Sequence, residues 1–305
     1  MRVLTFSCGS WRGMRMVAAL LLLLAIAGAA AVSAGQAGTS SADEASSVTA
    51  PDTCVQLEDF DDDDFPHRPD IDNRFLPMVP GTRLILEGSV DGVPHRVVFT
   101  VTDLSKRIDG VHSLVIWDTD ESEGELVESE LAFFAQDEDE NVWNLGEYPE
   151  EFEDGEFVGA PNTWITGEED AEAGIHMQAH PRVRSRQYVQ GFAPEIDFLD
   201  CARVVQRHQE TCVPAGCFDD VLVTHETNLL DPEGGIQSKF HAPGVGIVLI
   251  DSVEPPTGET LELVQIVHLS GSALRRARNQ ALRLDRRGYR FSEVYRSTSR
   301  ARRLR

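Results

Sequence analysis

The sequence predicts a mainly β protein: a curved antiparallel sheet, half-barrel or barrel-like, built of consecutive hairpins. From about residue 74, short runs that alternate apolar and polar residues follow one another, as is typical of half-buried strands. Asp-Gly pairs at 91–92 and 109–110 separate neighbouring runs, and this dipeptide favours the tight turn of a hairpin. No apolar repeat of helical period persists for twelve residues before residue 271.

The expected strands follow in chain order, with glycine or proline at most of their boundaries. In the first half they are RLILEGSV, VPHRVVFTVTDL, the two arms of KRIDGVHSLVIWDT, ELVESELAFFAQ, NVWNLGEY and the short FEDGEFVG. In the second half they are RQYVQGF, CARVVQRH, DVLVTHETNLL, SKFHAPGVGIVLIDSV and ETLELVQIVHLS. The segment FLDCARVVQRHQE also fits a helical turn, so its structure stays open. About two hundred residues of this kind can bury a sizeable core.

Four segments organise the chain. Residues 1–34 have the basic start, apolar run and small-residue end of a secretory signal peptide, so a secreted or cell-wall-associated location is expected. Residues 35–73 read as a flexible acidic leader, anchored at most by Phe60 and Phe65. Residues 74–270 form the β-rich domain, and residues 271–305 an arginine-rich tail expected to be disordered. No second apolar run follows the signal, which argues against a membrane-spanning mature chain.

Charge is divided sharply between the body and the tail. The tail holds twelve arginines, Asp285 and Glu293, a net +10, so the rest of the −24 chain carries −34. Such a body repels nucleic acid. The tail could fold back on the body, bind an anionic envelope polymer or phospholipid, or have no role; arginine suits phosphate binding. We expect a mobile tail with electrostatic contacts, whose deletion leaves the melting temperature nearly unchanged.

Four cysteines remain after the expected signal cleavage. An even count in an exported protein favours disulfides, and the paired short spacings of a zinc site are absent. Cys212 and Cys217 flank Val-Pro-Ala-Gly, which can reverse the chain and bring the two sulfurs together. That leaves Cys54 to pair with Cys201, although four cysteines allow three pairings.

The acidic stretch from Asp137 to Asn141 has two interpretations. Asp137, Asp139 and Asn141 match the first three ligand positions of an EF-hand calcium loop. Val142 and Tyr148 replace the glycine and the bidentate glutamate of that loop, and the flanks resemble strands. A hairpin turn is therefore favoured. A calcium site is the alternative, and calcium is the cofactor that this sequence could bind here.

Other candidate chemistry is weak. His176 and His180 have HxxxH spacing, but flanking Gly174 and Pro181 argue against the helix that zinc binding would need. His225 and Glu226 should point to opposite faces of a strand.

Seventeen acids lie between residues 118 and 156, and we expect them to form a solvated face. The tryptophans at 117, 143 and 164 should be core or half-core residues rather than the lining of a binding concavity. No serine-nucleophile elbow or phosphate loop is present in the sequence. No catalytic residue can be named.

Several segments resemble a family of exported bacterial β-rich proteins with a PGT, AQDxDGNVWxxGE and APGVG motif pattern. The matching segments are IDNRFLPMVPGT (71–82), IDGV (108–111), GELVESELAFFAQDEDENVWNLGE (124–147), NTWITGEEDAEAGIHMQAHP (162–181) and KFHAPGVGIV (239–248). They span about 180 residues in the family's order. Glu140 replaces the glycine of DxDGN, and the tail lies outside the pattern. The resemblance implies an exported β-rich domain of unestablished role.

Three functions remain open from the sequence. The first is a non-catalytic exported domain that binds an apolar or envelope ligand inside a curved sheet. The second is an extracellular hydrolase, which would need two carboxyl groups about 5–10 Å apart in a cleft. The third is a calcium-binding structural protein of the envelope.

Overall fold

The structure, a computed structural model, describes residues 54–231, 234–253 and 258–304. The predicted signal peptide and the first part of the leader, residues 35–53, lie outside the described residues. The strands are β1 (Thr82–Val90), β2 (Val93–Ile108), β3 (Val111–Ser122), β4 (Glu125–Gln136), β5 (Val142–Glu153), β6 (Glu156–Gly159), β7 (Trp164–Ile165), β8 (Glu172–Met177), β9 (Tyr188–Ala193), β10 (Phe198–Val213), β11 (Gly216–Asn228), β12 (Gln237–Ala242), β13 (Gly246–Ser252), β14 (Thr260–His268) and β15 (Arg302–Arg303). The helical elements are α1 (Gly271–Phe291) and the short 3-10 turns η1 (Asp62–Asp64), η2 (Pro194–Ile196) and η4 (Val294–Ser297).

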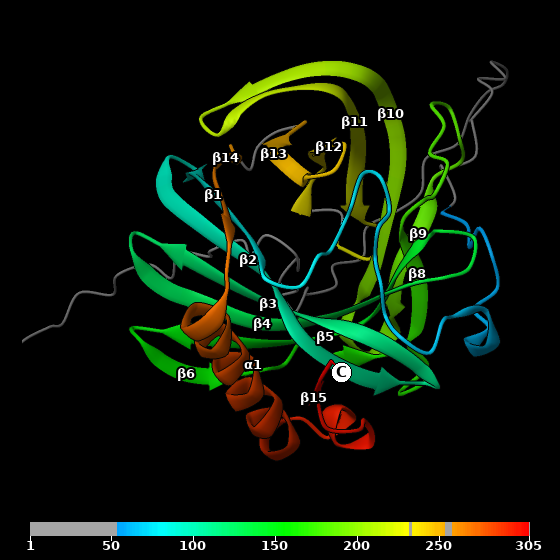
Figure 1. Cartoon of the computed structure of the whole chain (residues 1–305), viewed down its shortest axis with the longest axis vertical. Coiled ribbons are helices and arrows are strands. Elements are labelled where there is room, and N and C mark those ends of the chain that lie inside the picture. The colour runs from blue at the N-terminus through cyan, green and yellow to red at the C-terminus, as the bar shows by residue number, and fades with distance from the viewer. Residues whose placement is uncertain (1–53, 232–233, 254–257, 305) are drawn as a thin grey trace, which may run out of the picture.

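Within the described residues, twelve strands close into an antiparallel barrel, which confirms the predicted fold class. The order around the barrel is β1-β14-β13-β12-β11-β10-β9-β8-β5-β4-β3-β2, and pairing of β1 with β2 closes the ring. Most neighbours are consecutive hairpins (Figure 1). The Asp-Gly turns form as expected, because Asp91 (φ 52°) and Gly92 (φ 77°) both adopt the left-handed conformation of a tight hairpin.

Closure sets which side chains face inward, because alternate residues of a barrel strand point to opposite faces. On β3, Leu114 and Ile116 belong to an apolar cluster that also holds residues of β2, β4, β8, β10 and β11, so this face is the interior. Val111 and Val115 lie on the opposite face, in a second cluster with residues of α1. Strands β3 and β4 are therefore buried on both faces.

The arginine-rich tail is ordered, so the prediction of a disordered tail is wrong. Helix α1 lies against the outside of the barrel (Figure 1). Its contact face repeats at helical spacing: Ala277, Ala281, Leu284 and Gly288 are buried, while most of its arginines are exposed. Gly288 is needed there because a Cβ atom would lie 2.5 Å from the ring of Tyr295.

A buried ion pair fastens the tail to β2. Lys106 Nζ donates to Asp285 Oδ1 (2.9 Å), to the hydroxyl of Tyr289 (2.9 Å) and to the carbonyl of Ser299 (2.7 Å). The side chain of Lys106 is fully buried, and desolvation lowers its pKa to about 8 despite the neighbouring carboxylate. Arg278 adds an ion pair to Asp103 on the same strand.

The described part of the leader, residues 54–73, is also held against the barrel, so the prediction of flexibility is wrong there. Phe60 and Phe65 pack on Trp143 with ring centroids 5.7 and 6.1 Å away, as their anchoring role predicted. Ile71 is buried in the interior cluster.

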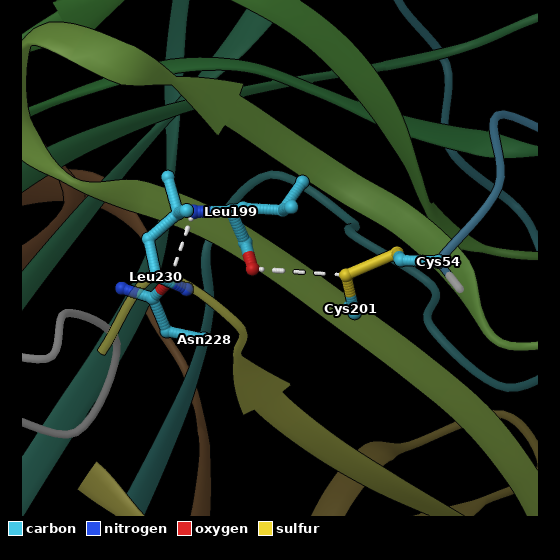
Figure 2. Close-up of a disulfide and its surroundings, with 5 residues drawn as sticks. All are labelled: Cys54, Leu199, Cys201, Asn228 and Leu230. Carbon is cyan, nitrogen blue, oxygen red and sulfur yellow. Dashed lines mark hydrogen bonds between the residues drawn. A yellow bond between two sulfur atoms is a disulfide. The ribbon is translucent and has the colours of Figure 1, made fainter. Parts of the chain in front are cut away.

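Both disulfides have the pairing that the sequence favoured. Cys54 is bonded to Cys201, which ties the beginning of the described leader to β10 (Figure 2). Cys212 and Cys217 close the β10–β11 hairpin. In the same region as the first disulfide, Asn228 Oδ1 accepts hydrogen bonds from the amides of Leu199 and Leu230, at 2.9 and 3.0 Å.

The ambiguous segment FLDCARVVQRHQE lies in strand β10. The long pairing of β10 with β11 decides its structure, because sheet contacts override a weak local preference. Among the described helices, none is long and apolar enough to cross a membrane.

We predict that Lys106→Met lowers the free energy of unfolding by about 3–5 kcal/mol, because it leaves Asp285 buried without its cation. Chemical denaturation measures this. Arg96→Met is the matched control on the same strand: Arg96 pairs with Glu87 and Glu121 in partly exposed positions, so its loss should cost about 0–1 kcal/mol. Equal losses in the two variants would contradict the structural role given to the buried pair.

Candidate ligand-binding site

A strap, residues 71–81, crosses the barrel (Figure 1). Its side chains Phe75, Leu76 and Met78 belong to the interior apolar cluster. Asn73 fixes its conformation: its Oδ1 accepts from the amides of Phe75 and Leu76, and its Nδ2 donates to the carbonyls of Glu140 and Gln178. Gln136 Oε1 accepts from the amides of residues 72 and 73. These hydrogen bonds hold the strap in a defined position within the barrel.

Between the strap and the strands lies a cavity of about 50 Å³, here called the strap pocket. Its lining is almost entirely apolar: Leu76, Pro77, Met78, Leu84, Leu86, Val97, Phe99, Asp118, Phe134, His176, Val245, Gly246, Ile247 and Ile250. The two polar members are buried, and each has an atom without a hydrogen-bond partner, Asp118 Oδ1 and His176 Nδ1. Buried polar atoms are rarely left unpaired, so these two mark a place where a ligand atom or water would bind.

Asp118 belongs to a wall of acids inside the barrel, here called the acid wall: Asp118 and Asp120 on β3, and Glu128 and Glu130 on β4. Asp118 lies directly opposite Glu130, and Asp120 opposite Glu128. All four are at most 7% exposed. Like charges directly opposite one another destabilise a sheet.

Burial and mutual repulsion favour the protonated forms of Asp118, Glu128 and Glu130 in the acid wall. Desolvation, with a contribution from Asp120, raises the pKa of Asp118 to about 8. Desolvation raises the pKa values of Glu128 and Glu130 well above the ordinary range, and neighbouring carboxylates add to the effect. On β5, desolvation raises the pKa of Glu147 to about 7, although Asn144 and Trp164 donate to its two oxygens.

On strands β11 and β12, away from the acid wall, a buried acid is paired with a buried cation. Lys239 on β12 forms an ion pair with Glu226 on β11 at 2.6 Å, and Thr224 donates to the same carboxylate. Despite desolvation, the Lys239 ammonium and nearby histidines lower the pKa of Glu226 to about 2. Desolvation lowers the pKa values of His176 to about 4 and of His241 to about 3, so both imidazoles are neutral at pH 7.

The expectation of a solvated acidic face is therefore wrong for these residues. The acids at 118, 120, 128, 130 and 147 face the barrel interior. The missed signal was the period of two along SELAFF: Glu130 shares a face with Ala132 and Phe134, both members of the interior cluster.

The stretch from Asp137 to Asn141 forms the turn between β4 and β5, the favoured interpretation. The amide of Asp137 donates to the carbonyl of Asn141, and Glu140 adopts a left-handed conformation (φ 68°). Asp137 is turned inward, since its carboxylate accepts from Asn141 and from Trp143 Nε1 (2.7 Å). Among the described residues, no three His, Cys, Asp or Glu side chains are arranged to hold a metal. Calcium at Asp137, Asp139 and Asn141 stays a prediction.

The remaining candidates separate as expected. His176 is buried on β8 while His180 is exposed in the following loop, so the HxxxH pair does not converge. Glu226 faces the interior and His225 the other face of β11. Trp143 and Trp164 are buried and Trp117 is half-buried.

No known protein family matches the chain, and no curated protein matches it. Two solved structures show distant similarity. One is a candidate exported protein with a YmcC-like fold from Bacteroides fragilis, 14% identical, covering 64% of this chain and 99% of that chain, with a TM-score of 0.34. The other is a candidate lipoprotein from Parabacteroides distasonis, 13% identical, covering 64% and 99%, with a TM-score of 0.30. Likeness at this level leaves the function of the chain open.

We predict that Glu130→Gln stabilises the protein at pH 7. The pKa of Glu130 is raised on folding, so its carboxyl costs stability above its unfolded pKa of about 4.3, and the cost grows as the pH rises. The gain should exceed about 1.4 kcal/mol at pH 7, the equivalent of one pKa unit, and vanish near pH 4. Thermal unfolding at the two pH values measures it. Glu153→Gln, an exposed acid on β5, is the control and should change stability by less than about 0.5 kcal/mol. A Glu130→Gln variant that is less stable at pH 7 would show that this carboxyl is ionised and satisfied in the fold.

Proposed function

We propose that this chain is an exported, non-catalytic barrel that binds a small apolar ligand in the strap pocket. The observation that carries the proposal is an apolar cavity inside the barrel whose lining includes two buried polar side chains, Asp118 and His176, that each have an atom without a partner. Largely apolar pockets with a few convergent polar groups are the usual form of small-molecule sites. The two disulfides support an oxidising location outside the cytoplasm.

The segments that resemble the exported family converge on this pocket. The strap comes from 71–82, Phe134 from 124–147, His176 from 162–181, and Val245 to Ile247 from 239–248. Gln136 and Glu140, from the second of these segments, also hold Asn73 of the strap. Four segments distant in sequence thus build one site, which supports a shared role for them.

The size of the pocket limits its ligand. A cavity of about 50 Å³ holds only a few heavy atoms, so an alkyl chain must displace Leu76 or Met78. The strap offers a route, because its next residue, Val79, is 59% exposed and gains contacts if an apolar ligand lies beside it. We propose binding with an outward shift of residues 76–79.

A carboxylate-dependent hydrolase is less well supported. Such an enzyme needs two carboxyl groups flanking a shared opening. One carboxyl, Asp118, lines the strap pocket. Its partner across the strands, Glu130, is 1% exposed and does not line the pocket.

We predict that the full mature chain binds the neutral fluorophore N-phenyl-1-naphthylamine and that Ile247→Trp weakens this binding at least about tenfold, the equivalent of about 1.4 kcal/mol. Ile247 lines the pocket, so the indole should fill it. Leu249→Trp is the matched control, a half-buried residue two positions along β13 that does not line the pocket. Fluorescence titration gives the affinities. Equal loss in both variants, or no binding by the wild type, would contradict the proposal.

A second candidate function concerns the anionic envelope polymer that the tail was expected to contact. A cavity of about 1140 Å³ lies where the end of the tail meets the leader and the β2–β3 hairpin. Five arginines and two histidines line it: His67, Arg68, Arg107, His112, Arg300, Arg302 and Arg303. Asp103 neutralises Arg303, and Asp62 and Asp63 line a smaller adjoining cavity. In a chain of net charge −24, this concentration of cations supports a site for phosphate-bearing polymer.

We predict that long-chain inorganic polyphosphate binds this cavity in a salt-dependent way. Replacing Arg68, Arg107 and Arg302 together by Gln should weaken binding at least about tenfold. The control variant replaces Arg275, Arg276 and Arg283 on α1, which removes the same charge outside the cavity. Fluorescence anisotropy of labelled polyphosphate measures both. Equal weakening in the two variants would show that binding depends on net charge and not on the cavity. Tighter binding to anionic vesicles than to polyphosphate would indicate a membrane surface as the partner.

Calcium binding at Asp137, Asp139 and Asn141 would add a structural role in the envelope. It is the weakest of the three proposals, because the turn already uses the Asp137 carboxylate for its own hydrogen bonds. A thermal midpoint that does not move between millimolar calcium and a chelator would remove it.

A further inference from the structure

The acid wall gathers more carboxyl groups than the neighbouring cations of the barrel interior can pair. Across β3 and β4, Asp118 opposes Glu130 and Asp120 opposes Glu128. Glu147 on β5 lies opposite Ala132, beside the same wall. Interior carboxyl groups in such number are costly, since each must be either paired with a cation or kept protonated.

Lys239 and His95, two basic residues of the interior, already have acidic partners. Lys239 is engaged by Glu226 at 2.6 Å. His95 on β2 contacts Asp120 at 2.5 Å. Neither oxygen of Glu130 has a hydrogen-bond partner, and the same is true of Asp118 Oδ1.

These unpaired oxygens lie close to the strap pocket. Asp118 lines the pocket, and Glu130 is its cross-strand partner on β4. On the pocket's lining, His176 presents a ring nitrogen, Nδ1, that also has no partner. The lining of the pocket thus combines apolar side chains with one carboxyl and one imidazole that have unpaired atoms.

We propose that the polar end of the ligand is an organic cation, an alkylammonium group held by Asp118 with Glu130 behind it. The inference rests on the proposed binding of an apolar ligand and adds the chemistry of its head. An organic ammonium fits better than a metal ion, because no three acidic or histidine side chains among the described residues converge in a metal geometry. The apolar lining favours an alkyl or aryl amine over a small hydrophilic one.

Binding exchanges a proton for the ligand's charge. In the free protein the carboxyl of Asp118 carries a proton at pH 7, since burial raises its pKa to about 8. When R–NH₃⁺ takes its place beside the carboxyl oxygens, the acid O–H bond breaks, the proton passes to solvent, and the ammonium N–H groups donate to the new carboxylate. The net charge of the interior is unchanged, which avoids burying an uncompensated ion.

The titratable groups of the barrel interior set the pH dependence of this exchange. They are His95 from β2, Asp120 from β3, Glu128 and Glu130 from β4, Glu147 from β5, His176 from β8, Asp200 from β10, Glu226 from β11, Lys239 and His241 from β12, and Glu259 beside β14. Most are acids, so a rise in pH ionises more of them and strengthens the binding of a cation. The affinity for an alkylammonium should therefore rise from pH 5 to pH 8.

The test compares octylamine, octan-1-ol and octanoate as displacers of bound N-phenyl-1-naphthylamine at pH 7, with the full mature chain. These compounds share one alkyl chain and differ in the charge of the head. We expect octylamine to bind at least about tenfold more tightly than octan-1-ol, and octanoate to bind most weakly. Calorimetry in buffers of different ionisation enthalpy should show release of about one proton per octylammonium.

Two variants locate the effect. Asp118→Asn and Glu130→Gln keep the shape of the side chains and remove the ability to form a carboxylate, so each should reduce the preference for octylamine over octan-1-ol to less than about threefold. Glu153→Gln is the control and should keep the preference.

The outcomes separate the two proposals. If none of the three compounds displaces the fluorophore, the proposed apolar function fails and this inference fails with it. If octylamine and octan-1-ol displace it equally, or octylamine binds without proton release, the apolar function stands and the cationic head is wrong. The proton measurement needs no variant, so it decides the question even where a substitution prevents folding.

Discussion

Closure of the twelve-stranded barrel is the constraint on which the rest of the structure depends. Once β1 pairs with both β2 and β14, alternate residues of β3 and β4 face the enclosed interior of the barrel. The opposite faces of the same strands are covered by α1 and the end of the tail. The acids of β3 and β4 are thus enclosed because residue alternation points them inward and the barrel is closed. The apolar residues that line the strap pocket face inward for the same reason.

The interior divides into two electrostatic halves. Around β11 and β12, Glu226 and Lys239 form a buried ion pair, and Thr224 donates a hydrogen bond to the same carboxylate. Such a pair can fix the pairing register of the two strands. Around β3 and β4, burial of Asp118 and Glu130 is tolerated by protonation. Unpaired buried acids beside a pocket cost stability, and residues of this kind are common where a protein recognises a ligand.

The sequence predicted the barrel better than it predicted the site. Alternation and Asp-Gly turns are local, so the hairpins were readable. The acid wall was not, because Leu131 and Phe133 on the other face of β4 are also apolar, and a strand buried on both faces does not reveal which side holds the interior. The burial of that outer face depends on α1, whose spacing of Ala277, Ala281, Leu284 and Gly288 was obscured by the surrounding arginines. Lys106, the residue that fastens the tail, was indistinguishable from a surface lysine until its partner Asp285 was placed.

The central claim is that Asp118, Glu128 and Glu130 of the free protein are neutral, because desolvation and neighbouring carboxylates raise their pKa values. Carboxyl-¹³C NMR of the protein at pH 7, with resonances assigned through Glu130→Gln, measures this directly. The account predicts the chemical shift of a protonated carboxylic acid for Glu130, moving toward that of a carboxylate well above pH 7. A carboxylate shift for Glu130 at pH 7 in the free protein would contradict it.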